Sequence, residues 1–203
     1  MANKKVIIGL CGKQRVGKDT AYKIIKELYP QLSVRRFAFA DALKKACAQL
    51  FCISESNFYF AKEKPTRLRW ENVNQYFLDD FGNGHHEGFI THRELLQLFG
   101  MACRYIYPDI WVDIVINQLK TEPYDIAVIT DVRFPNEVQK LKEIGAILIK
   151  IKRKTGIKDI HQSEQWVDFL KDKEFDYIMG TYDYSPPMDE LYQRWRALLK
   201  EIL

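Results

Sequence analysis

The sequence predicts an α/β protein in which a parallel sheet carries helices on both of its faces. Short apolar runs such as 6–8 and 126–129 have the composition of strands that are buried on both faces. Segments with helical spacing, 21–28 and 138–144, alternate with these runs. Glycines and polar residues follow where the apolar runs end, which is where ligands gather in a parallel sheet.

Length and composition suit a single domain that binds a small anionic molecule. The 203 residues leave room for one core and a smaller covering subdomain. The hydrophobic fraction of 47% supports a core, and the charged fraction of 29% favours solubility. The net charge of +4, from 31 basic and 27 acidic residues, is too balanced for a protein that binds nucleic acid.

The cysteines and the apolar runs favour a cytoplasmic protein. Cys11, Cys47, Cys52 and Cys103 form no C-x-x-C pair and have no histidine at zinc-ligand spacing, so we expect reduced core thiols. The chain enters a strand at once, without the apolar region of a signal peptide. No apolar run approaches the length that crosses a membrane, so we expect no membrane partner.

The first predicted strand, Val6–Ile8, leads into the segment Gly9–Thr20, which contains the pattern G-x-x-x-x-G-K. Gly12 and Gly17 allow a tight turn whose N–H groups point at an anion, and the following helix adds the positive end of its dipole. Lys18 would then reach the β- and γ-phosphates of a nucleoside triphosphate. The flanking strand and helix favour this P-loop over a glycine turn with a solvated lysine.

The loop departs from the usual pattern at one position. Asp19 stands where a Ser or Thr hydroxyl normally meets Mg²⁺, and Thr20 follows it. A carboxylate is a hard oxygen ligand, so Asp19 could hold the metal directly or through water, with Thr20 assisting. Asp131, after the run 126–129, is placed like the acidic group that supports magnesium in P-loop enzymes. The alternative for Asp131 is a cap for the helix that begins at Pro135.

A strand, a helix and a segment of different composition come next. We expect the strand over 34–39 and a helix capped by Asp41, with its apolar residues on one face. From about 53 to 90 the residues are charged or turn-rich. We interpret this segment as an insertion over the sheet rather than as a second core.

The remaining elements continue the alternation of helices and strands. A capping box of Thr91 and Glu94 predicts a helix that Gly100 interrupts. Pro135 can start another helix and Gly145 can end it. The other predictions are a helix over 109–119, strands over 126–129, 146–151 and 177–179, and a closing helix after Pro186 and Pro187.

Basic residues follow two of the predicted strands. Arg133 lies two residues after Asp131, where its guanidinium could bind a phosphate through two parallel hydrogen bonds. The alternative is an ion pair with Glu137. The run from Lys150 to Lys158 is a solvated face or, in a phosphoryl-transfer enzyme, a lid that brings cations over the transferring group. We interpret His161 as a surface loop residue rather than a catalytic one, and His85 and His86 as exposed loop residues rather than metal ligands.

One ordered set of motifs runs through most of the chain. It comprises GKDT at 17–20, FAD at 39–41 with Lys44, R-x-x-x-Q-x-x-G at 93–100 followed by Arg104 and Trp111, DVRFPNE at 131–137, and D-x-H-x-S-E at 159–164. In this order the set resembles the deoxynucleoside monophosphate kinases of tailed bacteriophages. The resemblance implies a P-loop NTPase-type three-layer sandwich over 1–203, with a core of 1–52 and 108–203, a helical acceptor-binding insertion at 53–107 and a basic lid at 153–172.

The resemblance also implies a reaction and the residues that carry it. The reaction is ATP-dependent phosphorylation of deoxynucleoside 5′-monophosphates, with Mg²⁺ as cofactor and nucleotides as partners. The catalytic residues would be Lys18, Asp131 and Arg133. The ATP site would comprise Gly12, Arg15, Val16, Gly17, Lys18, Asp19 and Thr20, with Asp19, Thr20 and Asp131 near the metal. The acceptor site would comprise Asp41, Lys44, Arg67, Arg93, Gln97, Gly100, Arg104, Trp111 and Arg133.

Some features of the resembled group stay open or differ here. Trp111 could stack on the acceptor base, and the alternative is core packing on the stripe of its helix. Met101 follows Gly100 where the family usually has Thr, and Gly180-Thr181 replaces an Asn after the last strand. Members of the group often pair as dimers, so the resemblance is compatible with a homodimer, in the host cytoplasm if the source is viral.

Two other functions remain open from the sequence. One is a kinase for another phosphorylated small molecule, of the phosphomevalonate or dephospho-coenzyme A type. The motifs GKD and H-x-S-E also occur in kinases of the phosphomevalonate type. The other is a nucleotide-binding module that phosphorylates nothing. Arg93, Gln97 and Arg133 argue against the second, because a protein that binds only ATP needs no second anion pocket.

Overall fold

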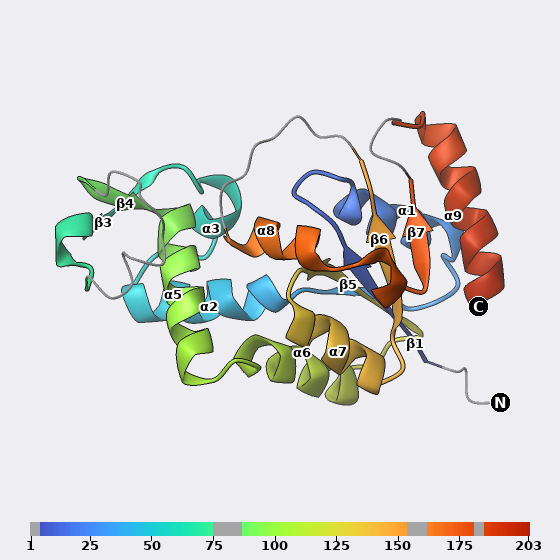
Figure 1. Ribbon diagram of the computed structural model, residues 1–203, viewed down its shortest axis with the longest axis horizontal. Helices are drawn as coiled ribbons and strands as arrows, with labels where there is room; N and C mark the ends of the chain where they lie inside the picture. The colour runs from blue at the N-terminus through green and yellow to red at the C-terminus, as the bar shows by residue number, and fades with distance from the viewer. Residues whose placement is uncertain (1–4, 75–86, 154–161, 181–184) are drawn as a thin grey trace. The chain divides into compact units, whose positions relative to one another are not determined.

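The computed structural model describes residues 5–74, 87–153, 162–180 and 185–203 (Figure 1). The three histidines at 85, 86 and 161, Thr181 and the basic residues at 154 and 158 lie outside these ranges, so their roles stay predictions. The chain divides into two compact units, 1–39 with 115–203 and 40–114. We call them the sheet unit and the inserted unit.

The sheet unit contains a five-stranded sheet whose pairings are all parallel. Its strands are β1 (Val6–Cys11), β2 (Val34–Phe37), β5 (Ile126–Val132), β6 (Ile147–Ile151) and β7 (Tyr177–Met179), in the order β2-β5-β1-β6-β7. The chain passes from β1 to β2 on one side, whereas β6 and β7 lie on the other. In open α/β sheets, ligands bind beyond the carboxyl ends of the strands at the point where the strand order reverses. In this sheet that point is the loop after Cys11.

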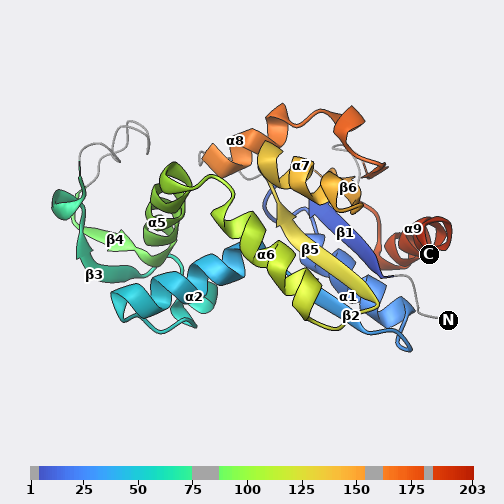
Figure 2. The same cartoon turned by 90° about the horizontal axis from the view of Figure 1, so that it is seen from below.

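Helices cover both faces of this sheet, as the sequence predicts (Figure 2). On one face α1 (Lys18–Leu28) and α9 (Met188–Ile202) contribute Ile24, Ile25, Trp195 and Leu199 to a core with apolar residues of β1, β5 and β6. On the other face lie α7 (Pro135–Glu143) and the part of α6 (Ile110–Thr121) that belongs to this unit. The predicted three-layer α/β sandwich is confirmed.

The inserted unit has a core of its own. Its elements are α2 (Phe39–Phe51), α3 (Asn57–Phe60), the antiparallel pair β3 (Pro65–Arg69) and β4 (Phe89–Thr91), a 3₁₀ turn over Trp70–Asn72, and α5 (His92–Ile106). Phe58, Trp70, Ile90, Leu95 and Leu98 are buried together. The expectation that this segment forms no second core is therefore wrong. Phe58, Trp70 and Ile90 are too far apart in the sequence for a local pattern to reveal that they pack together.

Two predicted boundaries in this region are corrected. The strand expected over 34–39 ends at Phe37, and α2 begins at Phe39, so that Asp41 lies in the first turn of the helix rather than capping it. The physical reason is a bond across 92 residues. Oδ1 of Asp131 accepts the backbone N–H of Phe39 at 2.9 Å and so satisfies the helix start.

Gly100 does not interrupt α5, which runs on to Ile106. A Cβ atom at Gly100 would lie 3.0 Å from Cδ2 of Leu43, so the missing side chain lets α2 and α5 approach each other. The start of the helix is as predicted. Thr91 caps it, and its capping box with Glu94 is complete.

The predicted lid ends in a helix that the sequence pattern did not reveal, α8 (Gln162–Phe169), followed by a 3₁₀ turn over Asp172–Glu174. Lys150 is buried, donates to the carbonyl oxygen of Leu170 and lies 3.3 Å from Asp172, which Lys152 also contacts. These two lysines therefore hold the chain after α8. They are neither a solvated face nor free to close over a ligand.

The cysteines are free thiols, but they do not all lie in cores. Cys11 and Cys47 are buried and Cys103 is partly buried, whereas Cys52 is exposed. The prediction of a core thiol is wrong for Cys52, because it follows α2 in a left-handed turn with φ of 51°. No described helix has both the length and the apolar character that a membrane crossing requires.

Candidate functional site

The segment between β1 and α1 has the geometry of an anion-binding loop. Gly12 has φ of 153°, and a Cβ atom there would lie 2.6 Å from the carbonyl oxygen of Ile151. Gly17 has φ of 105° and precedes α1 without a side-chain cap. Both positions require glycine. The first N–H groups of α1 are thus left for an anion, beside the positive end of the helix dipole.

The other loop residues have separate roles. Val16 is buried and belongs to the apolar core below the loop, whereas Arg15 is exposed with φ of 62°. Nζ of Lys13 lies 2.8 Å from Oδ2 of Asp168 on α8. The loop is thereby linked to the described end of the predicted lid.

Lys18 lies inside the loop and is only 8% exposed. Its Nζ donates to the carbonyl oxygens of Gly12 at 2.5 Å and of Lys13 at 2.7 Å. Burial, followed by the nearby guanidinium of Arg133, lowers the pKa of Lys18 from 10.5 to about 8, although Asp131 opposes the shift. An anion in the loop would offer its own oxygens in exchange for the two carbonyls.

Asp131 and Arg133 stand at the end of β5, next to β1 in the sheet, and both act on the pKa of Lys18. The charged groups of these three residues therefore lie close enough to influence one another. Asp131 caps α2 through Phe39, not the helix at Pro135 that was its alternative role. Glu137, which is buried, accepts the backbone N–H of Arg133 at 2.7 Å and fixes the turn into α7.

The oxygen ligands predicted for a metal form no site by themselves. The carboxylate of Asp19 is 81% exposed and lies 3.8 Å from Nε of Arg36. Thr20 is half-buried, and one oxygen of Asp131 is engaged by Phe39. In the part of the chain that is described, no three His, Cys, Asp or Glu side chains gather where they could hold a metal. The residues fit a divalent ion that takes most of its ligands from phosphate and water.

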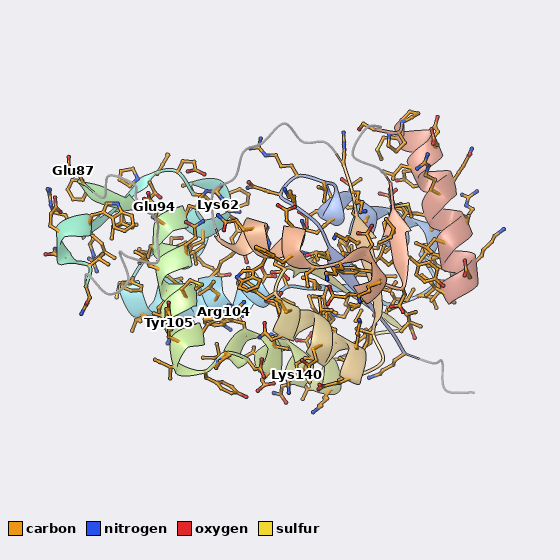
Figure 3. All side chains as sticks on the ribbon, viewed as in Figure 1. Lys62, Glu87, Glu94, Arg104, Tyr105 and Lys140 are labelled. Carbon is orange, nitrogen blue, oxygen red and sulfur yellow. The ribbon has the colours of Figure 1, made fainter. Side chains whose placement is uncertain are left out.

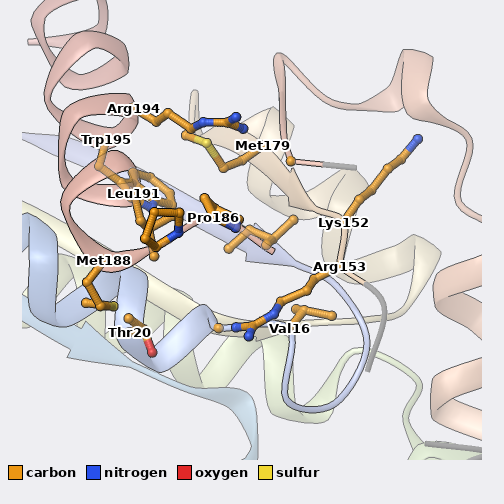
Figure 4. A pocket seen from close by; sticks show the side chains of 14 residues that line it. Val16, Thr20, Lys152, Arg153, Met179, Pro186, Met188, Leu191, Arg194 and Trp195 are labelled. Atoms are coloured by element: carbon orange, nitrogen blue, oxygen red, sulfur yellow. The ribbon is translucent and has the colours of Figure 1, made fainter. Parts of the chain in front are cut away.

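A cavity of about 270 Å³ lies beside the loop, between the start of α1, the ends of β6 and β7 and the start of α9 (Figure 4). Met179 and Leu191 supply apolar walls, and Arg153 and Arg194 supply positive charge. Gly180 lines it too. Apolar walls with a few polar groups are typical of sites for flat organic ligands such as nucleobases.

Four predicted acceptor residues form a stripe along α5 in the inserted unit. Arg93, Gln97, Gly100 and Arg104 follow one another at intervals of four, three and four, which places them on one face of a helix. All but Gly100 are half-buried. Figure 3 shows Glu94 and Arg104 toward opposite ends of this helix. The stripe therefore extends over most of the length of α5.

Two further predicted acceptor residues come together on α2. Nζ of Lys44 lies 3.1 Å from Oδ1 of Asp41 and 3.9 Å from the centre of the Tyr59 ring. The hydroxyl of Tyr59 donates to the same carboxylate oxygen at 3.0 Å. Lys44 is nearly buried, so its position is well defined. Tyr59, on α3, was not predicted, because no motif connects it with Asp41.

The remaining predicted acceptor residues occupy different surroundings. Arg67 is exposed on β3, and its Nη2 donates to the carbonyl oxygen of Phe51 at 3.3 Å. Trp111 is 3% exposed, and its indole N–H donates to the carbonyl oxygen of Gly100 at 3.4 Å. Its ring packs against Phe99. Core packing, the alternative for Trp111, therefore describes the structure, and no ring face is left for a base to stack on.

Sequence reasoning missed several residues that belong to these sites. They are Tyr59 beside Lys44, Glu63 beside Arg93, and the cavity residues Met179, Leu191 and Arg194, whereas Arg153 was predicted only as part of the basic lid. Arg194 follows Glu190 at the spacing of a helix-surface pair, and they do form an ion pair. That spacing alone gives no sign that the same arginine faces a cavity.

A glycine loop at the reversal point of a parallel sheet, with a lysine inside it, defines the class of P-loop nucleotide-binding proteins. Within this class, the family model described as deoxynucleotide monophosphate kinase matches residues 56–179. The chain belongs to the deoxynucleotide monophosphate kinase family. The resemblance seen in its motifs is confirmed.

The relatives agree with this membership. A protein of Acanthamoeba polyphaga mimivirus named "Putative deoxynucleotide monophosphate kinase" is 33% identical over 206 residues, 93% of each chain. The deoxynucleoside-5′-monophosphate kinase of Escherichia phage T5 is 26% identical over 212 residues, covering 80% of this chain and 85% of its own. Among solved structures, shikimate kinase from Acinetobacter baumannii in complex with shikimate matches with a TM-score of 0.46, 12% identity and 98% and 95% coverage. That last likeness is too low to carry an argument.

Proposed function

We propose that the protein transfers the γ-phosphoryl group of ATP to a deoxynucleoside 5′-monophosphate and releases the diphosphate. Its family supports this acceptor class, and the relatives from mimivirus and phage T5 are named for it. The observation that carries the proposal is the ammonium of Lys18 inside the glycine loop, within the influence of Asp131 and Arg133.

The sheet unit would bind the donor. The N–H groups of the loop and of the first turn of α1 hold the β- and γ-phosphates, and Lys18 exchanges the carbonyls of Gly12 and Lys13 for phosphate oxygens. The adjoining cavity takes the nucleoside, with Met179 and Leu191 against its flat faces. Arg153 and Arg194 at the same cavity suit the negative charge of the nucleotide.

The carboxylates near the loop suit a bound Mg²⁺. Asp19, Thr20 and Asp131 are the residues that would contact the ion or its water ligands. When bound, Mg²⁺ neutralises part of the charge on the phosphates.

Catalysis would need no covalent intermediate. Lys18 is held by the carbonyl oxygens of the loop and Arg133 follows the end of β5, and both stabilise the charge that develops on the transferring phosphoryl group. Burial and then the repulsion from Arg133 lower the pKa of Lys18, and an anion near both groups offsets these effects. Alignment of the two substrates supplies the rest of the acceleration.

The inserted unit would supply the acceptor site. Lys44 and the stripe of Arg93, Gln97 and Arg104 present positive and hydrogen-bonding groups suited to a phosphate ester and a nucleoside. Gly100 lets Leu43 of α2 pack against this helix, and Trp111 holds the backbone there through its indole N–H. Trp111 therefore acts by packing and not as a stacking platform.

Replacing Lys18 tests the donor half of the proposal. Lys18→Ala should lower kcat for deoxynucleotide phosphorylation by at least ~10³-fold and leave the circular dichroism spectrum unchanged. Lys23→Ala is the matched control, because Lys23 lies on α1 but is exposed. Near wild-type activity in Lys18→Ala would show that the P-loop assignment is wrong.

A panel of phosphorylated acceptors with labelled ATP tests the acceptor half. Deoxynucleoside monophosphates should be the preferred acceptors over phosphomevalonate and dephospho-coenzyme A. A preference for a non-nucleotide acceptor would overturn the nucleotide assignment. ATP binding without any transfer would overturn the assignment as a kinase.

A further inference from the structure

The guanidinium of Arg93 is held on one side only. Its Nε donates to Oε1 of Glu63 at 2.6 Å, and the Arg93 side chain remains 33% exposed. Across the described ranges this is the single hydrogen bond or ion pair of the guanidinium. The terminal amino groups, Nη1 and Nη2, therefore keep donors for a ligand.

Glu63 reaches Arg93 from a turn that is fastened to the start of α5. The backbone N–H of His92 donates to the carbonyl oxygen of Lys64 at 3.1 Å, and that of Arg93 to Lys62 at 2.9 Å. Glu63 lies between the two accepting residues. Its backbone is thus fixed relative to Arg93, although its side chain is 72% exposed.

The buried ring of His92 strengthens this attachment. Nδ1 lies 2.9 Å from the carbonyl oxygen of Lys64 and 3.2 Å from that of Ala61, so it must carry a proton and donate. Nε2 then accepts from the side-chain amide of Asn57 at 3.3 Å. Contacts on both sides of the ring connect the turn, α3 and α5.

We propose that Glu63 is a positioning residue: by holding Nε of Arg93, it presents the Nη1–Nη2 edge of the guanidinium to the 5′-phosphate of the acceptor. This inference rests on the proposed function, in which Arg93 belongs to the acceptor site. The Nη1–Nη2 edge can donate two parallel hydrogen bonds to two phosphate oxygens. An arginine that is already oriented loses less conformational entropy on binding than one that rotates freely.

The opposite role would be competition, with the Glu63 carboxylate standing where the phosphate binds. The two roles predict opposite changes in acceptor affinity when Glu63 is removed. Positioning is favoured by the engaged atom, because Glu63 meets Nε and leaves both terminal amino groups available.

Steady-state kinetics with a deoxynucleoside monophosphate and ATP test the proposal. Glu63→Ala should raise the KM for the acceptor about tenfold, with kcat and the KM for ATP within about twofold of wild type. Glu63→Gln retains an oxygen that accepts from Nε, so its acceptor KM should rise less than about threefold. The matched control is Glu71→Ala, which removes an exposed Arg69–Glu71 pair of the same unit and should leave every constant unchanged.

A double-mutant cycle separates positioning from an independent effect. In an Arg93→Ala background, Glu63→Ala should change the acceptor KM no further, because Glu63 acts only through Arg93. A lower KM in Glu63→Ala, an unchanged KM, or additive effects in the cycle would overturn the proposal. If the wild-type protein phosphorylates no deoxynucleotide, the proposed function fails first; if it does and the cycle is additive, only the positioning role fails.

Discussion

At the scale of the residue, Lys18 links the fold to the chemistry, because the loop that would bind phosphate first binds this ammonium. Two carbonyl oxygens hold Nζ in a place that is almost closed to water. A buried positive charge next to Arg133 is unfavourable for the folded protein, and the lowered pKa of Lys18 expresses this. A phosphate between the two groups would remove the penalty.

This penalty predicts a pH-dependent stability. In the unfolded chain Lys18 keeps its proton up to about pH 10.5, whereas in the native protein it loses the proton near pH 8. Between these values the unfolded state binds more protons, so stability rises with pH by up to about 3 kcal/mol. Urea unfolding without nucleotide should show this rise for wild type relative to Lys18→Met, and no difference in slope below pH 8. Equal slopes for both proteins throughout would contradict the prediction.

The same group predicts proton uptake when ATP binds. Phosphate oxygens favour the charged ammonium and so raise the pKa of Lys18 above the value of about 8 that it has in the empty loop. Above pH 8 binding should therefore take up a proton, and ATP affinity should fall as the pH rises. Calorimetry in two buffers of different ionisation enthalpy measures the uptake. Lys18→Met should take up none; equal uptake in this variant would assign the proton to another group.

The sequence predicts residues that belong to a local pattern and misses those whose partners are distant. Lys18 follows from the spacing of two glycines, and the cap at Thr91 from a glutamate three residues on. The hydrogen bond between Phe39 and Asp131 joins residues that are 92 positions apart, and no sequence pattern near either residue predicts it. Trp111 shows a second limit of prediction from sequence. Its position on the apolar stripe of a helix is equally compatible with burial in the core and with contact to a ligand.

At the scale of the element, the phosphate loop is shaped by its neighbour β6 as much as by its own glycines. The carbonyl oxygen of Ile151 would lie only 2.6 Å from a Cβ atom at residue 12. Because that obstacle is backbone, it cannot be moved by a change of side-chain rotamer. The loop and the end of β6 therefore fit each other as one unit.

Gly12→Ala should disrupt the loop and weaken ATP binding by at least ~tenfold, because the backbone must leave its left-handed conformation and shift away from β6. Gly145→Ala is the matched control. Gly145 also has a positive φ, of 74°, but a Cβ atom there would have no neighbouring atom within 4 Å. This control should lower thermal stability and leave ATP affinity unchanged in the same titration. Unchanged ATP affinity in Gly12→Ala would contradict the account of the loop.

Helices were predicted well where the hydrophobic period and the capping residues indicate the same boundaries, and poorly where they do not. The helix after Thr91 was predicted from its cap, yet its length was underestimated, because a glycine in a helix is usually unfavourable. Contact with Leu43 explains why this glycine is there. The short helix α8 was missed because it follows a charged segment and shows only a few apolar positions, such as Val167.

At the scale of the whole molecule, the chain forms two units with separate apolar cores. The parallel sheet was predictable, because strands such as β1 and β5 are short apolar runs that alternate with helical segments along the chain. The second core was not, because Phe58, Trp70 and Ile90 come from elements too short to show a period. Separate cores mean that damage to one unit can be distinguished from damage to the other.

Phe58→Ala should destabilise the inserted unit by about 3–5 kcal/mol, because Phe58 is fully buried and a cavity would remain. ATP affinity should stay within about threefold of wild type, since the loop belongs to the sheet unit. Phe60→Ala is the matched control, because Phe60 is 90% exposed. Denaturant unfolding and an ATP titration make the comparison. Loss of ATP binding in folded Phe58→Ala would show that the cores are not independent.

The unequal exposure of the four thiols makes this enzyme suitable for site-selective fluorophore attachment. Maleimide reagents should react first at Cys52, which is solvent-exposed after α2, and should spare Cys11, which is buried beneath the loop. Burial also raises the pKa of the Cys11 thiol to about 12, so almost none of it is in the reactive thiolate form at neutral pH. A dye on Cys52 would report on the inserted unit during turnover while the phosphate loop stays chemically untouched.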